Sequence, residues 1–167
     1  MRPTIPAVVF LAFALSSPAA AADREGLLVG FTTGFGGSND CDQCELGIGF
    51  AFGVHAGATV AKGLAVVGEG SMLAYAEAPE GAGNFSLVGG AQYFPIPWVF
   101  VGAAAGVGTT GGAATDYDTG PIVVAQAGLD FRGRKRFGFD VRGRYERRVD
   151  ETDGGRALTF LLGFTWY

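Results

Sequence analysis

The sequence predicts an all-β protein, a closed antiparallel up-and-down barrel of eight transmembrane β-strands. First, apolar residues recur at every second position, which is the period of a strand and not of a helix. Second, the 167 residues include 29 glycines, and each glycine inside a helix costs about 1 kcal/mol relative to alanine. Third, the connections between the alternating segments are long and short in turn.

The first 22 residues are expected to be a cleaved signal peptide. Arg2 precedes an apolar run over residues 5–15, and small residues with an A-x-A cleavage pattern end at Ala22. The apolar run is shorter than the roughly 20 residues that a membrane-spanning helix needs. We therefore expect export of the chain, cleavage after Ala22 and one barrel domain over residues 23–167.

Eight strands follow from the alternation and from the turn residues between the alternating segments. Each has roughly 9 to 12 residues, the length with which a tilted strand crosses the hydrocarbon core of a bilayer. The predicted strands are Leu27–Phe35, Leu46–Ala56, Leu64–Tyr75, Phe85–Phe94, Val99–Gly108, Pro121–Phe131, Phe137–Arg147 and Ala157–Tyr167.

The connections between these strands alternate in length along the whole chain. The short ones are TVAKG, PIPW and RGRKR, and the long ones are GGSNDCDQC, AEAPEGAG, TTGGAATDYDTG and VDETDGG. This order places the short turns and both ends of the barrel domain on one side. It is typical of outer-membrane barrels, which have short periplasmic turns and longer extracellular loops.

The two faces of the strands differ in polarity, most clearly in FGFDVRGRYERR at residues 137–148. One face has Phe137, Phe139, Val141 and Tyr145, whereas the other has charges at positions 140, 142, 144 and 146. Charges are too few on the other strands to solvate an outer surface, so we expect the apolar face to meet lipid. Aromatic residues near the strand ends are expected to form two interfacial girdles. They are Tyr93, Phe94, Trp98, Phe131, Phe137, Trp166 and Tyr167 at the short-turn end, and Tyr75, Phe85 and Tyr145 at the other.

The polar face predicts a network of charges inside the barrel. An eight-stranded barrel is only wide enough for its interior to be filled by side chains, and an unpaired charge there costs several kcal/mol. We expect the charges to pair as a structural plug, with a narrow ion path as the alternative. Two arginines against four acids leave a negative excess, which water or a protonated carboxyl would offset. The network comprises Glu69, Asp130, Asp140, Arg142, Arg144 and Glu146.

The remaining candidates for chemistry are few. Cys41 and Cys44 are separated by two residues in the first long connection, and in an exported chain they predict a local disulfide. A zinc site would need further ligands, and no other cysteine exists. The single histidine, His55, is expected to face inward as a packed residue with no serine–acid pair beside it. We therefore assign no catalytic, cofactor-binding or metal-binding residue.

The two ends of the predicted barrel differ in charge. The long connections are acidic and could gather divalent cations at a lipopolysaccharide surface. The short turn RGRKR is basic and is expected to meet anionic headgroups on the periplasmic side. Its charged residues are Arg132, Arg134, Lys135 and Arg136.

The signal peptide, the eight amphipathic strands and the aromatic end LLGFTWY resemble small outer-membrane β-barrel proteins of the OmpA/OmpX-like type. The resemblance covers the whole barrel domain and is architectural. It implies an outer-membrane location with both termini periplasmic, and a monomer. It also implies lipid and lipopolysaccharide as partners, with the barrel-assembly machinery during biogenesis. One departure is that Tyr167 is out of phase with the apolar set Leu158 to Trp166, whereas the family's final aromatic faces lipid.

These observations favour a non-enzymatic bacterial outer-membrane barrel, with a structural role or a cell-surface interaction role through its four long connections. Two alternatives stay open. One is a narrow pore for ions or small solutes, and the other is a soluble periplasmic barrel that binds a ligand as lipocalins do. Neither a cofactor nor a nucleic-acid partner is expected.

Overall fold

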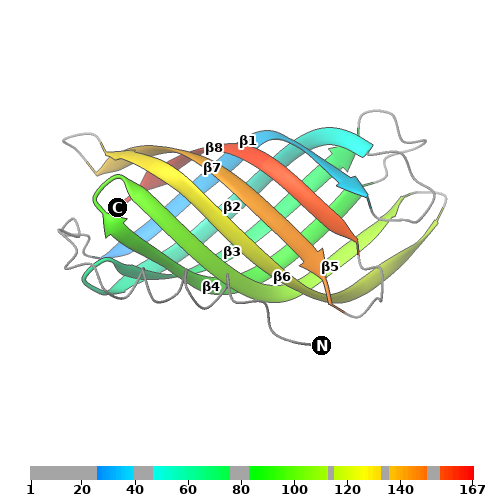
Figure 1. Cartoon of the computed structure of the whole chain (residues 1–167), viewed down its shortest axis with the longest axis horizontal. Helices are drawn as coiled ribbons and strands as arrows, with labels where there is room; N and C mark the ends of the chain where they lie inside the picture. Colours follow the sequence, from blue (N-terminus) through cyan, green and yellow to red (C-terminus); the bar gives the residue numbers. More distant parts are fainter. Residues whose placement is uncertain (1–25, 40–46, 76–82, 113–114, 133–135, 150–154) are drawn as a thin grey trace, which may run out of the picture.

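The computed structural model describes residues 26–39, 47–75, 83–112, 115–132, 136–149 and 155–167. They form a closed barrel in which each strand pairs antiparallel with its neighbours in the chain and β1 closes onto β8 (Figure 1). The predicted eight-stranded antiparallel barrel is therefore confirmed. The strands are β1 Leu27–Asn39, β2 Gly47–Ala61, β3 Leu64–Tyr75, β4 Gly83–Ile96, β5 Val99–Gly112, β6 Thr115–Arg132, β7 Phe137–Arg148 and β8 Arg156–Trp166. In the part of the chain that the structure describes, no helix has the length and apolar character needed to cross a membrane.

Several strands are longer than their patterns predict, β6 most of all. The prediction started this strand at Pro121, but it begins at Thr115. Proline is compatible with the strand interior here because its carbonyl oxygen accepts a hydrogen bond from Val149 N, on the β7 side. Nitrogen and oxygen of one residue face the same side of an antiparallel strand, so the missing N–H removes no bond to β5.

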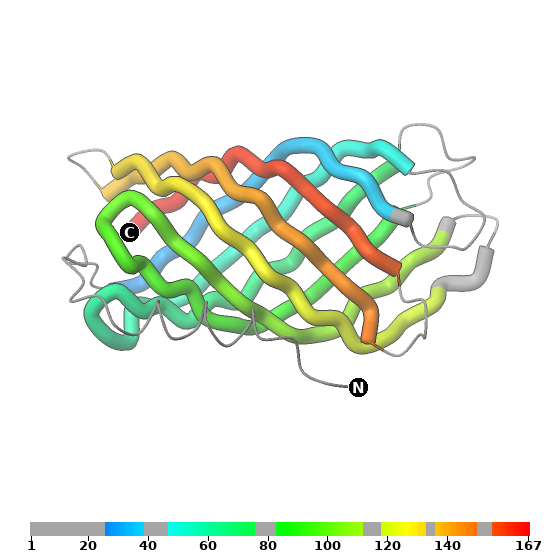
Figure 2. Tube along the Cα trace, in the orientation of Figure 1, coloured from blue at the N-terminus to red at the C-terminus, as the bar shows by residue number. Residues whose placement is uncertain are grey.

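The short turns lie together at one end of the barrel. Lys62 and Gly63 connect β2 to β3, and Gly63 has a φ of 72°, a left-handed conformation that glycine adopts without strain. Pro97 and Trp98 connect β4 to β5 at the same end, where β1 starts and the chain ends (Figure 2). We call this the short-turn end. The opposite end, where β1 ends at Asn39 and β8 begins, is the long-loop end.

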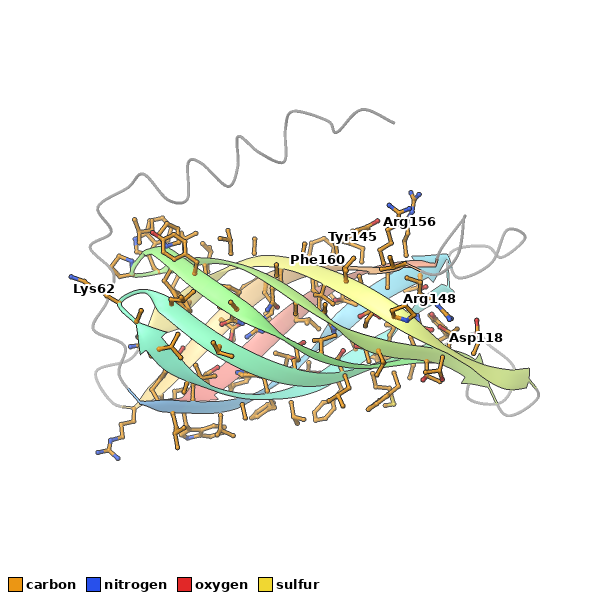
Figure 3. The ribbon with its side chains drawn as sticks, turned by 90° about the horizontal axis from the view of Figure 1, so that it is seen from below. Lys62, Asp118, Tyr145, Arg148, Arg156 and Phe160 are labelled. Atoms are coloured by element: carbon orange, nitrogen blue, oxygen red, sulfur yellow. The ribbon has the colours of Figure 1, made fainter. Side chains whose placement is uncertain are left out.

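The barrel has large apolar side chains on its outside and charged side chains on its inside (Figure 3). Phe50 on β2 is 75% exposed and Ile48 64%, whereas the side chains of Arg142 and Arg144 on β7 are almost completely buried. Burial alternates along β7 and β8 with a period of two, as the sequence pattern predicts.

The interior also contains three apolar clusters. Leu28, Ala65, Val67, Phe94 and Phe100 pack at the short-turn end, where β4 meets β5. The second cluster has Ala51, Leu73, Ala157 and Leu161, with Tyr75 against it, and the third has Val88, Ile122 and Val124. The assignment of Tyr75 and Phe94 to the outer aromatic girdles was therefore wrong, because both share the parity of the inward residues on their strands. Tyr167 also packs inside, in agreement with its position out of phase with the apolar set Leu158 to Trp166.

Candidate functional site

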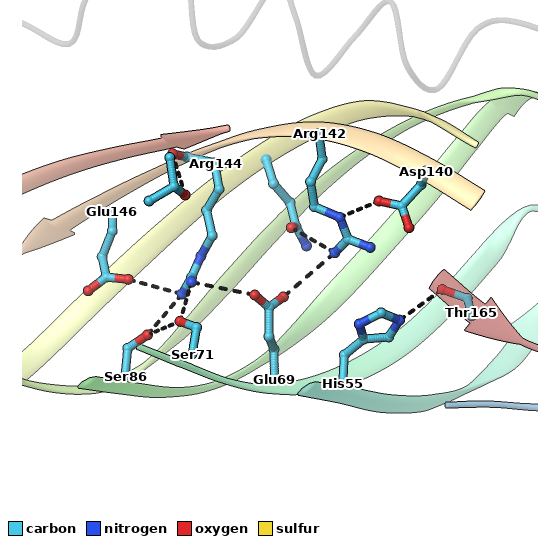
Figure 4. A network of polar contacts seen from close by, with 11 residues as sticks. His55, Glu69, Ser71, Ser86, Asp140, Arg142, Arg144, Glu146 and Thr165 are labelled. Carbon is cyan, nitrogen blue, oxygen red and sulfur yellow. Dashed lines mark hydrogen bonds and ion pairs between the residues drawn. The ribbon is translucent and has the colours of Figure 1, made fainter. Parts of the chain in front are cut away.

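The centre of the barrel is crossed by ion pairs from Glu69 on β3 to two arginines on β7 (Figure 4). In a closed ring of eight strands, β3 and β7 lie diametrically opposite each other. Glu69 Oε1 lies 3.4 Å from Arg144 Nη1, and Glu69 Oε2 lies 3.9 Å from Arg142 Nη1. All three side chains are 3–4% exposed. The interior is thus bridged across its full width at this level.

Arg142 has further partners on its own strand and on β6. Its Nε donates to Asp140 Oδ1 at 2.6 Å, and Nη1 lies 3.5 Å from Gln126 Oε1. The guanidinium carbon also lies 5.3 Å from the centre of the Phe100 ring, within the range of a cation–π contact. Room for Asp140 is made by Gly163 on β8, where a Cβ atom would collide with the carboxylate.

Arg144 joins β7 to β3 and β4. Its Nη2 donates to Ser86 Oγ at 3.0 Å and to Glu146 Oε2 at 2.9 Å, and Nη1 donates to Ser71 Oγ. The two serine hydroxyls lie 2.7 Å apart. Arg144 therefore ties four inward residues to one guanidinium, the geometry for which the arginine fork is suited.

The remaining predicted acid, Asp130, lies directly opposite Asp140 in the register of β6 and β7, and it lines a small cavity together with Asp140 and Arg142. Its Oδ2 accepts a hydrogen bond from Tyr167 Oη at 2.7 Å, and the Arg132 guanidinium stacks over the Tyr167 ring at 3.7 Å. Tyr167 therefore points into the barrel. Of the predicted basic turn, Arg132 contributes to this inward cluster and Arg136 is exposed, whereas Arg134 and Lys135 lie outside the described residues.

A third interior arginine, Arg148, was missed because the strand was predicted to end at Arg147. Its Nη2 lies 3.0 Å from Asp118 Oδ2, and Nη1 lies 3.4 Å from the Asp118 carbonyl oxygen. Asp118 belongs to the part of β6 that precedes Pro121, which the prediction also left out. The signal was present in the sequence, because Arg148 has the parity of Arg142, Arg144 and Glu146. This residue reduces the predicted negative excess of the interior.

His55 on β2 faces the interior and is 4% exposed. Its Nε2 lies 3.0 Å from Thr165 Oγ1 on β8. Gly30 lies between these strands, and a Cβ atom there would meet the imidazole ring at 2.6 Å. The absence of a side chain at Gly30 therefore makes space for the histidine inside the barrel.

Cavities lined by described residues along the interior have volumes of about 10 to 20 Å³. A cavity of roughly this size holds one water molecule. Within the described residues, no group of three or more His, Cys, Asp and Glu side chains is placed to hold a metal ion. Cys41 and Cys44 fall outside the described residues, so their disulfide stays a prediction.

Comparison with known proteins shows similarity in structure. No protein-family model matches the chain, and no curated protein sequence matches it either. Among solved structures, Neisserial surface protein A has a TM-score of 0.71 at 14% sequence identity, covering 84% of this chain and 96% of that one. The attachment invasion locus protein of Yersinia pestis has a TM-score of 0.54 at 16% identity, covering 83% and 97%. The structure of the same Yersinia pestis protein in complex with the heparin analogue sucrose octasulfate also matches, with a TM-score of 0.54 and 14% sequence identity.

These solved structures are small eight-stranded barrels of bacterial outer membranes. Their identity to this chain, 14–16%, is too low for residue-by-residue transfer. The agreement covers 83–84% of this chain and 96–97% of the two solved structures, and it includes the closed antiparallel topology of this chain. The chain described here has the fold of the small eight-stranded outer-membrane barrels.

Proposed function

We propose that this chain is a non-enzymatic protein of the bacterial outer membrane, which it spans as a barrel with a plugged interior. The observation that carries the proposal is the inverted polarity of the barrel. Large apolar side chains such as Phe50, Phe52 and Leu87 are at least half exposed on the outside, while arginines and acids are buried within. Soluble monomers rarely expose apolar patches beyond a few hundred Å², whereas a bilayer makes such a surface favourable.

The same polarity argues against a soluble ligand-binding barrel. A lipocalin-like protein needs an apolar cavity inside and a polar surface outside. Here the cavities each hold about one water molecule, and the centre is crossed by ion pairs between β3 and β7.

We further propose that the long-loop end faces the cell exterior and that both termini are periplasmic. The short turns at residues 62–63 and 97–98 support this orientation, because outer-membrane barrels have their short turns in the periplasm. The four long connections would then form the exposed surface through which a structural or cell-surface interaction role is exerted. Two of the similar structures are named as a surface protein and an attachment protein, which agrees with this role. The monomeric state, the contacts with lipopolysaccharide and those with the assembly machinery stay predictions.

Fractionation with surface labelling tests location and orientation together. We expect the protein in the outer-membrane fraction, and we expect a membrane-impermeant maleimide to label Cys41 and Cys44 on intact cells after mild reduction. The matched control is a Cys41→Ser/Cys44→Ser variant that also has Lys62→Cys at the short-turn end. This control should be labelled only after the outer membrane is permeabilised. Recovery of the protein in the soluble fraction without detergent would overturn the membrane assignment, and labelling of the control on intact cells would reverse the orientation.

Planar-bilayer recording separates the plug from the pore. We expect no steady conductance from the wild-type protein, because Glu69 and Arg144 meet across the diameter of the barrel. Glu69→Ala/Arg144→Ala should introduce current, since it removes both halves of this bridge. Arg156→Ala, on the outside of β8, should leave the recording unchanged. Steady current steps in the wild type that disappear in Arg142→Ala would instead favour a pore.

A further inference from the structure

Two arginines lie side by side on the outside of the barrel at the long-loop end. Arg147 on β7 and Arg156 on β8 are directly opposite each other in the strand register, and both are exposed. Like charges at directly opposite positions of a sheet repel and destabilise it. In the described part of the chain, neither guanidinium makes an ion pair or a hydrogen bond. Figure 3 shows Arg156 pointing away from the barrel, unlike Arg148, which turns inward to Asp118.

The surface beneath this pair becomes apolar step by step. The next outward pair in the register is Tyr145 with Leu158, 39% and 49% exposed, and the following one is Gly143 with Phe160. A Cβ atom at Gly143 would meet nothing within 4 Å, so there is open space beside Phe160. One face therefore has cations at its rim, an aromatic hydroxyl below them and apolar surface below that. This order matches the phosphate, glycerol or sugar, and acyl regions of a lipid.

We propose that Arg147 and Arg156 together bind the phosphate monoester headgroup of an outer-leaflet lipid, with an acyl chain along Leu158 and Phe160. The proposal rests on the proposed function, which places this rim at the outer surface of the membrane. A phosphate monoester has a charge of roughly −1.5 to −2 near neutral pH, as phosphorylated side chains do, and can offset two guanidinium charges at once. Each guanidinium can present two parallel N–H donors to phosphate oxygens. A bound phosphate would offset the repulsion between the two arginines, and this relief would add to the free energy of binding.

The choice of lipid over a protein segment follows from position. Both arginines belong to membrane-spanning strands and share their face with side chains that the proposed bilayer covers. A free phosphate ion would use the same chemistry but would gain nothing from the apolar surface below. Asp150, Glu151 and Asp153 follow β7 in the sequence and are the competing counter-ions. If these acids neutralised the arginines, a lipid with a phosphate monoester would have no effect on the unfolding temperature of the barrel.

The test uses the full barrel domain folded into phosphatidylcholine vesicles, with or without a minor fraction of phosphatidic acid as the phosphate monoester probe. We expect phosphatidic acid to raise the unfolding temperature of the wild type. Arg147→Gln/Arg156→Gln should weaken retention of phosphatidic acid, measured by native mass spectrometry, by roughly tenfold, because charge-assisted hydrogen bonds are lost. The control is Lys62→Gln, which removes an exposed charge at the opposite end, outside the basic turn, and should retain most of the preference.

The effect of Arg156→Gln on the unfolding temperature should change sign between the two lipid mixtures, which adds a second test. In phosphatidylcholine alone, Arg156→Gln should raise the unfolding temperature, because it relieves the repulsion with Arg147. In vesicles with phosphatidic acid, the same substitution should lower it, because the bound phosphate loses a partner. Inorganic phosphate should not displace the lipid.

Three results would overturn the proposal. One is equal loss of retention in the double variant and its control, and another is equal retention of phosphatidylglycerol, a phosphate diester; both would show general charge attraction. The third is an unfolding temperature of the wild type that does not respond to phosphatidic acid. Failure of the wild type to fold into any vesicle would be a different result, because it would contradict the proposed membrane function itself.

Discussion

Replacing Arg142 and Arg144 together by alanine is expected to lower the free energy of unfolding of the barrel by at least about 3 kcal/mol. Removing one partner of a buried ion pair costs roughly 3–5 kcal/mol, because the other charge is left buried and uncompensated. Here the substitution removes the arginine partners of two buried acids, Glu69 and Asp140, and one partner of Glu146. Loss of stability is therefore the main expected effect of this double substitution.

Urea unfolding in vesicles, followed by the mobility of folded and unfolded forms on gel electrophoresis, measures this loss. Lys62→Ala/Arg136→Ala is the matched control, because it removes two exposed cations at the short-turn end and should cost within about 1 kcal/mol. A rescue variant converts Arg142 and Arg144 to methionine. It also converts their acidic partners to the corresponding amides or to apolar residues, at Glu69, Asp140 and Glu146. It should recover most of the stability, since well-packed neutral residues often replace a buried ion network at little cost. If the double alanine variant were as stable as its control, the buried network would not stabilise the barrel.

The second large effect is expected on the outer surface, at the middle of β8. Leu162 is 45% exposed and points outward. In a bilayer, Leu162→Arg should lower the free energy of unfolding by roughly 2–4 kcal/mol, the cost of a cation at the membrane midplane of a barrel. In a soluble barrel the same position would face water, and the change would stay within about 0.5 kcal/mol. One substitution thus gives different results in the two environments.

The control is Leu27→Arg, which places the same charge on an outward residue at the short-turn end, where β1 begins. Its cost should be no more than about 1 kcal/mol, because charges near the membrane interface remain solvated. Equal and small effects at the two positions would show that the exterior of the barrel does not meet lipid.

The alternation of polarity could be interpreted directly from the sequence, since successive side chains of a strand point to opposite faces. Parity alone separates Val141 and Tyr145 from Arg142 and Arg144, and the structure has the same separation. The ends of the strands were harder to predict from the sequence. A proline at position 121 predicts a strand boundary, yet Pro121 lies within β6. It is compatible with the strand because its nitrogen faces away from β5.

The sequence pattern could not predict which interior side chains pair with one another. Pairing partners such as Ser71 and Ser86 for Arg144 depend on which strands face each other across the closed barrel. Polar residues of this kind have no periodic signature that names their partners. Tyr167 was grouped with the outer aromatic residues by its height although its phase pointed the other way, and its hydroxyl donates to Asp130 inside the barrel.

The ion pairs between β3 and β7 have a consequence for the order of folding. Ser71 and Arg144 are 73 positions apart in the chain, and no hairpin of neighbouring strands can bring them together. Their contact requires most of the sheet to exist and to have curled into a ring, which makes it costly in chain entropy. In an incompletely closed sheet, Arg142 and Arg144 can pair with Asp140 and Glu146 of their own strand, but Glu69 stays on the concave side without either arginine. Ring closure is the event that joins Glu69 to β7, so closure and completion of the interior network form one cooperative step.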